Sequence, residues 1–113
     1  MAANTHLEEL LDVVVKEGGS DLHLAAGRVP MLRVSGALVP LSKYSPLTSK
    51  ETEAMLRSIV SEDRWKLFEE SQSIDLSYAH KTDTRFRING YQAQGTISLA
   101  LRLIPHAVRT FTE

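Results

Sequence analysis

The chain has 113 residues, 42% of them hydrophobic and 24% charged, which is the usual balance of one globular domain with a single core. It contains no cysteine, which excludes disulfides, thiolate metal sites and a cysteine nucleophile. The net charge of −1 gives no global attraction to nucleic acid, and neither a signal peptide nor about 20 consecutive apolar residues can be found. We therefore expect one cytoplasmic domain over residues 1–113.

The first third of the chain predicts a helix followed by three strands. Thr5-His-Leu-Glu8 has the pattern of a capping box, and Gly18-Gly19 ends the helix that follows. Three strand candidates come next, at residues 22–26, 30–34 and 37–41. The last two are predicted to form a hairpin around Ser35-Gly36, and Pro40 indicates that the second of them lies at a sheet edge or ends there.

The middle of the chain predicts two helices and a strand. Thr48-Ser-Lys-Glu51 is a second capping box, and Ser61 with the two acids after it is typical of a helix N-terminus. Residues 74–78 alternate between apolar and polar, as a strand does. We expect the apolar residues of the two helices to face the core: Met55, Leu56, Ile59, Val60, Trp65, Leu67 and Phe68.

The segment from Arg85 to Pro105 alternates along much of its length and predicts a long hairpin. Residues two apart in a strand share a face, so Arg85 and Arg87 point to the side opposite Phe86. Short turns between neighbouring strands imply an antiparallel sheet. The fold class is therefore α+β, with five or six strands and helices packed on one face.

The turn of this hairpin has two candidate positions. Asn89-Gly90 is a strong two-residue turn signal, and a loop within Gln92–Gly95 is the competing choice, which we favour. In the later register Arg102 lies across from Arg85 or Arg87. Like charges that face each other across a ladder are destabilising. Such a pair makes more sense when an anion or a partner's carboxylate completes it.

The sequence contains no motif that assembles an active site. Gly18-Gly19 is followed by Ser20-Asp21, with no P-loop lysine, and the four histidines lack the spacing of metal ligands. Ser20, Asp21 and His23 are triad residue types, but Ser20 would point away from the other two. We interpret Ser20 or Asp21 as a turn cap and His23 as a half-buried side chain.

The arginines on the predicted sheet face leave two interpretations open. Arg85, Arg87 and Arg102 either lie on a solvated face with internal ion pairs or form an anion or partner site, since the guanidinium fork suits phosphate and carboxylate. Arg28 and Arg33 are expected to be solvated.

Four segments stand in an order and spacing that characterise one family: Gly19-Ser-Asp-Leu-His-Leu-Ala-Ala-Gly27, Pro30-Met-Leu-Arg-Val-Ser-Gly36, Arg85-Phe-Arg-Ile-Asn89 and Leu101-Arg-Leu-Ile-Pro105. Together they resemble the N-terminal domain of the PilT-type twitching-motility ATPases. These are type IV pilus retraction motors related to the type II secretion ATPases. The resemblance covers nearly the whole chain.

The resemblance implies a PAS-like domain that precedes a P-loop ATPase core, which is absent from residues 1–113. The fragment itself would be no enzyme and hold no cofactor or metal, while the full-length protein would be an ATPase that uses ATP and Mg. Its partners would be its own core and the neighbouring subunits of a homohexamer, and the pilus inner-membrane platform, with no nucleic acid. It would lie in the cytoplasm, peripheral to the inner membrane at the pilus base.

The resemblance also implies a role for particular arginines. By position, Arg87 and Arg102 would sense the nucleotide held by the core, with Arg85 as a secondary candidate. Family members commonly carry an arginine in the hairpin turn, where this chain has Gln94. Any contribution of that arginine is missing here.

Two other functions remain open at this point. The chain could be a free-standing PAS-like sensor that binds a small ligand between sheet and helices. It could also be a docking module that binds an acidic segment on Arg85, Arg87 and Arg102.

Overall fold

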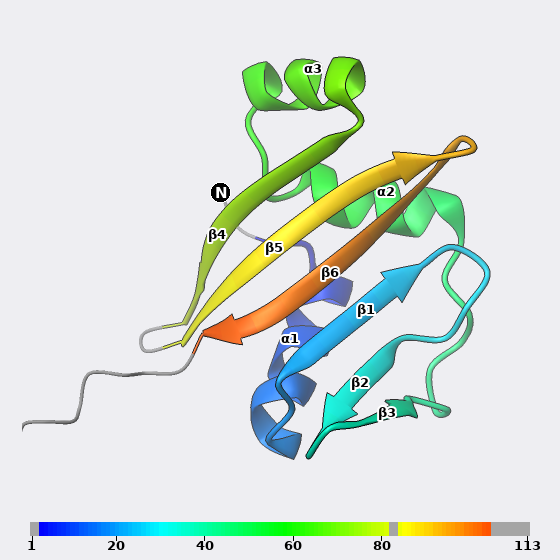
Figure 1. Ribbon diagram of the computed structural model, residues 1–113, viewed down its shortest axis with the longest axis vertical. Helices are drawn as coiled ribbons and strands as arrows, with labels where there is room; N and C mark the ends of the chain where they lie inside the picture. The colour runs from blue at the N-terminus through cyan, green and yellow to red at the C-terminus, as the bar shows by residue number, and fades with distance from the viewer. Residues whose placement is uncertain (1–2, 82–83, 105–113) are drawn as a thin grey trace, which may run out of the picture.

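The computed structural model describes residues 3–81 and 84–104, and these form a six-stranded antiparallel sheet with three helices. The strand order is β3-β2-β1-β6-β5-β4 (Figure 1). The strands are β1 (Asp21–Ala25), β2 (Met31–Val34), β3 (Ala37–Pro40), β4 (Ser73–His80), β5 (Thr84–Ala93) and β6 (Thr96–Ile104). The predicted α+β class is confirmed, and β3 with its Pro40 lies at a sheet edge as expected.

The helices leave one face of the sheet open. Helices α1 (Thr5–Glu17) and α2 (Ser49–Arg57) cover the far face in Figure 1, and α3 (Glu62–Ser71) packs beside β4 at the margin of the sheet. The core lies between the sheet and α1 and α2. Its fully buried side chains include Leu7, Leu10, Leu11, Leu22, Leu24, Leu32, Met55, Leu56, Phe86, Ile88, Leu99 and Leu101.

The first helix begins one residue earlier than the sequence pattern indicated. Asn4 is the N-cap, and its side-chain oxygen accepts a hydrogen bond from the Leu7 amide at 2.9 Å. The predicted capping box at Thr5 is therefore wrong, because asparagine is at least as good an N-cap as threonine and stands directly before it. Gly18 ends the helix in the left-handed region, as predicted. The two other predicted N-caps, Thr48 with its capping box and Ser61, are confirmed.

Helix α3 contacts the core through fewer residues than expected. Trp65 and Phe68 are buried, with ring centroids 5.2 Å apart. Leu67 is 63% exposed, which corrects its assignment to the core. Positions three apart share a helix face, whereas the residue directly before Phe68 points about 100° away.

The last hairpin turns at the later of the two candidate positions. Gln94 and Gly95 both have positive φ, 56° and 80°, and they connect β5 to β6. Asn89-Gly90 instead lies inside β5. A Cβ on Gly90 would come within 2.9 Å of Leu56 Cδ2, so the glycine lets α2 approach the sheet closely.

Candidate anion site on the open face of the sheet

The polar side chains of β1, β6 and β5 stand in one row across the open face. Arg87 on β5 and Arg102 on β6 are directly opposite each other in the ladder, which confirms the register that we favoured. On its other side Arg102 faces Asp21 of β1. Two like charges therefore sit at the centre of the row, an arrangement that is unfavourable unless anions compensate it.

Arg87 is compensated by an aspartate of the neighbouring strand. Its Nη2 and Nε donate to the two carboxylate oxygens of Asp75 on β4, at 2.9 and 3.4 Å. This two-point contact is the geometry in which a guanidinium matches a carboxylate. The hydrogen bond from Arg87 lowers the pKa of Asp75 below its usual 3.8, and the same contact raises the pKa of Arg87. Both groups are therefore ionised at neutral pH.

The carboxylate of Asp21 contacts two arginines at once. Its Oδ1 accepts a hydrogen bond from Arg102 Nε at 3.2 Å, and its Oδ2 lies 3.6 Å from Arg33 Nε. Arg33 also donates to the carbonyl of Gly36 at 3.1 Å. Arg33 remains exposed to solvent, at 39%, but it also has an ion-pair partner that the sequence did not indicate, because β2 pairs with β1 in a register that places Arg33 directly opposite Asp21.

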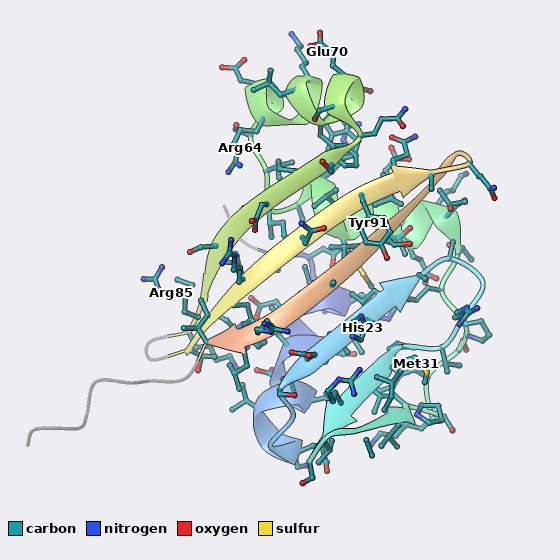
Figure 2. All side chains as sticks on the ribbon, viewed as in Figure 1. His23, Met31, Arg64, Glu70, Arg85 and Tyr91 are labelled. Carbon is teal, nitrogen blue, oxygen red and sulfur yellow. The ribbon has the colours of Figure 1, made fainter. Side chains whose placement is uncertain are left out.

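A shallow hollow of about 330 Å³ lies between these ion pairs. Ala100 on β6 lies directly opposite His23 of β1 and Asn89 of β5 in the ladder. Its small side chain leaves space between these larger residues. His23 points from β1 to the open side of the sheet (Figure 2). The hollow is lined by Asp21, His23, Asp75, Arg87, Asn89, Ala100, Leu101 and Arg102.

The three predicted site arginines do not all meet at this hollow. Arg87 and Arg102 line it, whereas Arg85 does not. Arg85 lies one row further along β5 and donates to Ser77 Oγ at 3.3 Å. Figure 2 shows its side chain beyond the β4 margin of the sheet.

The residues at the hollow suit the binding of a charged group better than catalysis. Its lining combines two guanidinium groups with the two carboxylates that pair with them, together with one imidazole and one amide, and it has no hydroxyl nucleophile. Ser20 belongs to a different environment, with its Oγ near the carbonyl of Arg33 at 3.5 Å. Over residues 3–81 and 84–104 there is no cluster of three histidine, aspartate or glutamate side chains that would hold a metal ion.

Sequence reasoning missed a buried histidine on the covered face. His80 is 1% exposed, and its Nε2 lies 2.8 Å from Asp12 Oδ1 of α1. Hydrogen bonds from Lys81 and then from His80 lower the pKa of Asp12. The alternation that buries Leu76 and Tyr78 continues to position 80, so the strand pattern alone could have indicated this burial.

The chain is similar to known pilus ATPases over most of its length. It is 36% identical over 107 residues to the type IV pilus retraction ATPase PilT of Pseudomonas aeruginosa, which covers 95% of this chain and 31% of that protein. It is 28% identical over 106 residues to the type IV pilus ATPase PilU of the same organism, covering 94% of this chain and 28% of PilU. The chain is a homologue of the PilT-type pilus ATPases.

Solved structures agree with this assignment. A crystal structure of the pilus retraction motor PilT with bound ADP matches 88% of this chain and 29% of its own, with a TM-score of 0.79 and 31% identity. The Legionella pneumophila ATPase DotB, at 21% identity and a TM-score of 0.74, shares the fold over 93% of this chain and 31% of DotB. No family model matches the sequence. The chain thus spans about 30% of the length of these relatives.

Proposed function

We propose that residues 1–113 form the N-terminal domain of a PilT-type motor and act there as a regulatory and assembly domain. The similarity to a pilus retraction ATPase over 95% of the chain carries this proposal. In it, ATP and Mg bind to a P-loop core outside these residues, and the domain itself performs no catalysis. Its partners are that core, neighbouring subunits of a homohexamer and the pilus platform, and it works at the cytoplasmic side of the inner membrane. No helix over residues 3–81 and 84–104 is long and apolar enough to cross a bilayer.

Within this function, Arg87 and Arg102 contact the terminal phosphate of a nucleotide held by the core, and Arg85 supports them at the margin. The position of Arg87 opposite Arg102 at one hollow supports this role, because arginine stabilises charge on a transferring phosphate and responds when that phosphate is lost. Both side chains remain largely exposed, at 68% and 74%, so a docked core could reach them.

The open sheet face also suits the alternative of a protein-docking module for acidic segments. A ligand between sheet and helices is less favoured, because that space is filled by buried side chains such as Leu10, Leu56 and Phe86.

The first experiment is an immunoblot of the source cells with an antibody against this domain. A band at least about twice the size of 113 residues is expected if a core domain accompanies it. A band matching 113 residues alone would favour the docking module.

The arginine role is then tested in the longer protein. We expect Arg87→Ala and Arg102→Ala to lower ATPase turnover on the order of 100-fold, as removal of a preorganised charge donor does. Arg28→Ala is the matched control, since Arg28 is also exposed but lies in the loop after β1. Unchanged turnover in both site variants would remove the nucleotide-sensing role while leaving the domain assignment intact.

A further inference from the structure

Two aspartates accompany the facing arginines on the open face of the sheet. Asp21 and Asp75 stand on opposite sides of the pair formed by Arg102 and Arg87, one on β1 and one on β4. Each aspartate draws one guanidinium outward, away from the other arginine. The two aspartates thereby compensate the repulsion between Arg87 and Arg102 without a bound ligand.

These ion pairs are placed so that they can open. The guanidinium groups are largely exposed, and the pair between Asp75 and Arg87 lies at the surface, whereas the Asp21 carboxylate is 14% exposed. Exposed ion pairs contribute little net stability, because water solvates the separated charges nearly as well. An arginine here can therefore exchange one anionic partner for another without unfolding the sheet.

The geometry favours a phosphate group as the incoming partner. Each arginine of the pair now has its own carboxylate: Asp75 receives the fork of Arg87 at both oxygens, and Asp21 receives Arg102 at one oxygen while its other oxygen faces Arg33. No single carboxylate accepts from both Arg87 and Arg102. A terminal phosphate presents three acceptor oxygens and close to two charges, so it can engage both arginines together.

We propose that Asp75 and Asp21 are resting partners of Arg87 and Arg102, which a terminal phosphate displaces when the core presents it. This inference rests on the proposed function. The aspartates compete with free anions in solution, so the arginines bind phosphate weakly unless it is held at the high effective concentration of a docked domain. The site thereby responds to docked nucleotide and ignores free phosphate.

The test follows the arginine Nε–H signals of the ¹⁵N-labelled chain by NMR during titration with inorganic triphosphate at constant ionic strength. Relative to the wild type, we expect Asp75→Asn to tighten triphosphate binding roughly two- to five-fold, the range that exposed ion pairs allow, and Asp21→Asn to tighten it as well. The double variant should show approximately the product of the two effects, because the pairs are separate. Acetate, a single carboxylate, should not gain affinity to the same extent.

Glu53→Gln is the matched control. Glu53 also pairs with an arginine, Arg57 on α2 at 3.7 Å, and its loss changes the net charge equally at a site away from the open face. Equal effects of Asp75→Asn and Glu53→Gln would mean that only net charge matters, and would overturn the inference. An absence of triphosphate binding in the double variant would overturn it as well. Asp75→Asn alone suffices if Asp21→Asn does not fold.

The two proposals can fail separately. If the aspartate variants behave like Glu53→Gln while Arg87→Ala still stops turnover of the longer protein, the resting-partner inference fails and nucleotide sensing stands. If the aspartate variants tighten triphosphate binding while Arg87→Ala leaves turnover unchanged, nucleotide sensing fails and the competition by the aspartates stands.

Discussion

Replacing Gly90 with alanine tests how closely α2 packs against the sheet. The new Cβ would lie 2.9 and 3.1 Å from the two δ carbons of Leu56 and 3.3 Å from Ile74 Cγ2. Leu56 is fully buried, so it has little room to move aside. Overpacking of this kind costs about 1–3 kcal/mol, and the smaller entropy of the unfolded alanine chain offsets about 0.4–1 kcal/mol of that.

The net expectation is a loss of roughly 0.5–2 kcal/mol in the free energy of unfolding for Gly90→Ala. For a domain near this size the midpoint of thermal unfolding should fall by roughly 2–12 °C. Circular dichroism during heating, together with urea unfolding, measures both quantities. The two methods should agree in sign if unfolding is two-state.

A double-mutant cycle identifies the cause. Leu56→Ala alone should cost about 2–5 kcal/mol, because it leaves a cavity in the core. In that background the methyl group of Gly90→Ala enters free space, and the substitution should become neutral or stabilising. The close-packing argument is refuted if Gly90→Ala leaves the wild-type unfolding midpoint unchanged or raises it.

Three further predictions concern a helix cap, a buried hydroxyl and the ion pair of the site. Asn4→Ala should lower the free energy of unfolding by about 0.5–2 kcal/mol in urea titrations, whereas Thr5→Ala should be near neutral, and equal losses would contradict the cap assignment. Tyr78→Phe removes a hydroxyl that accepts a hydrogen bond from the Ala3 amide at 2.9 Å. It should lower the free energy of unfolding by about 0.5–1.5 kcal/mol in the same assay. The Asp75 carboxyl should titrate below pH 3.8 when followed by ¹³C NMR. The ion pair with Arg87 therefore contributes to the free energy of unfolding above that pH, and this contribution is lost as the pH falls through the lowered pKa of Asp75. In Arg87→Ala this midpoint should rise, and an unmoved midpoint would show that Arg87 is not the cause.

The faces of the long hairpin could be predicted because they depend on local alternation. Arg85 and Arg87 were placed opposite Phe86 from the two-residue period of a strand, and the structure confirms this. The turn was harder, since Asn89-Gly90 is a strong hairpin signal. The close approach of Leu56 explains the glycine in another way, and that contact depends on packing that no local pattern records.

The partners of the site arginines could not be predicted, because they depend on strand order. Asp21 and Arg102 are 81 residues apart in sequence and meet only because β1 pairs with β6. Asp75 and Arg87 are 12 residues apart in sequence, on a predicted strand and the next one, but a shift of one residue in register would turn the aspartate to the covered face. The sequence shows which residues are charged, but only the pairing of the strands in the folded sheet shows which of these residues are in contact.

The same register explains why a cross-strand arginine pair can exist in this sheet. Strand β6 carries no acidic residue, and it follows β5 through the turn at Gln94 and Gly95 in the register that sets Arg87 opposite Arg102. The unfavourable contact is then relieved from outside the pair, by Asp75 and Asp21 on the flanking strands. An arrangement that only optimised stability would place acid opposite base on β5 and β6 themselves. The facing arginines therefore support the proposal that an external anion binds at this position on the sheet.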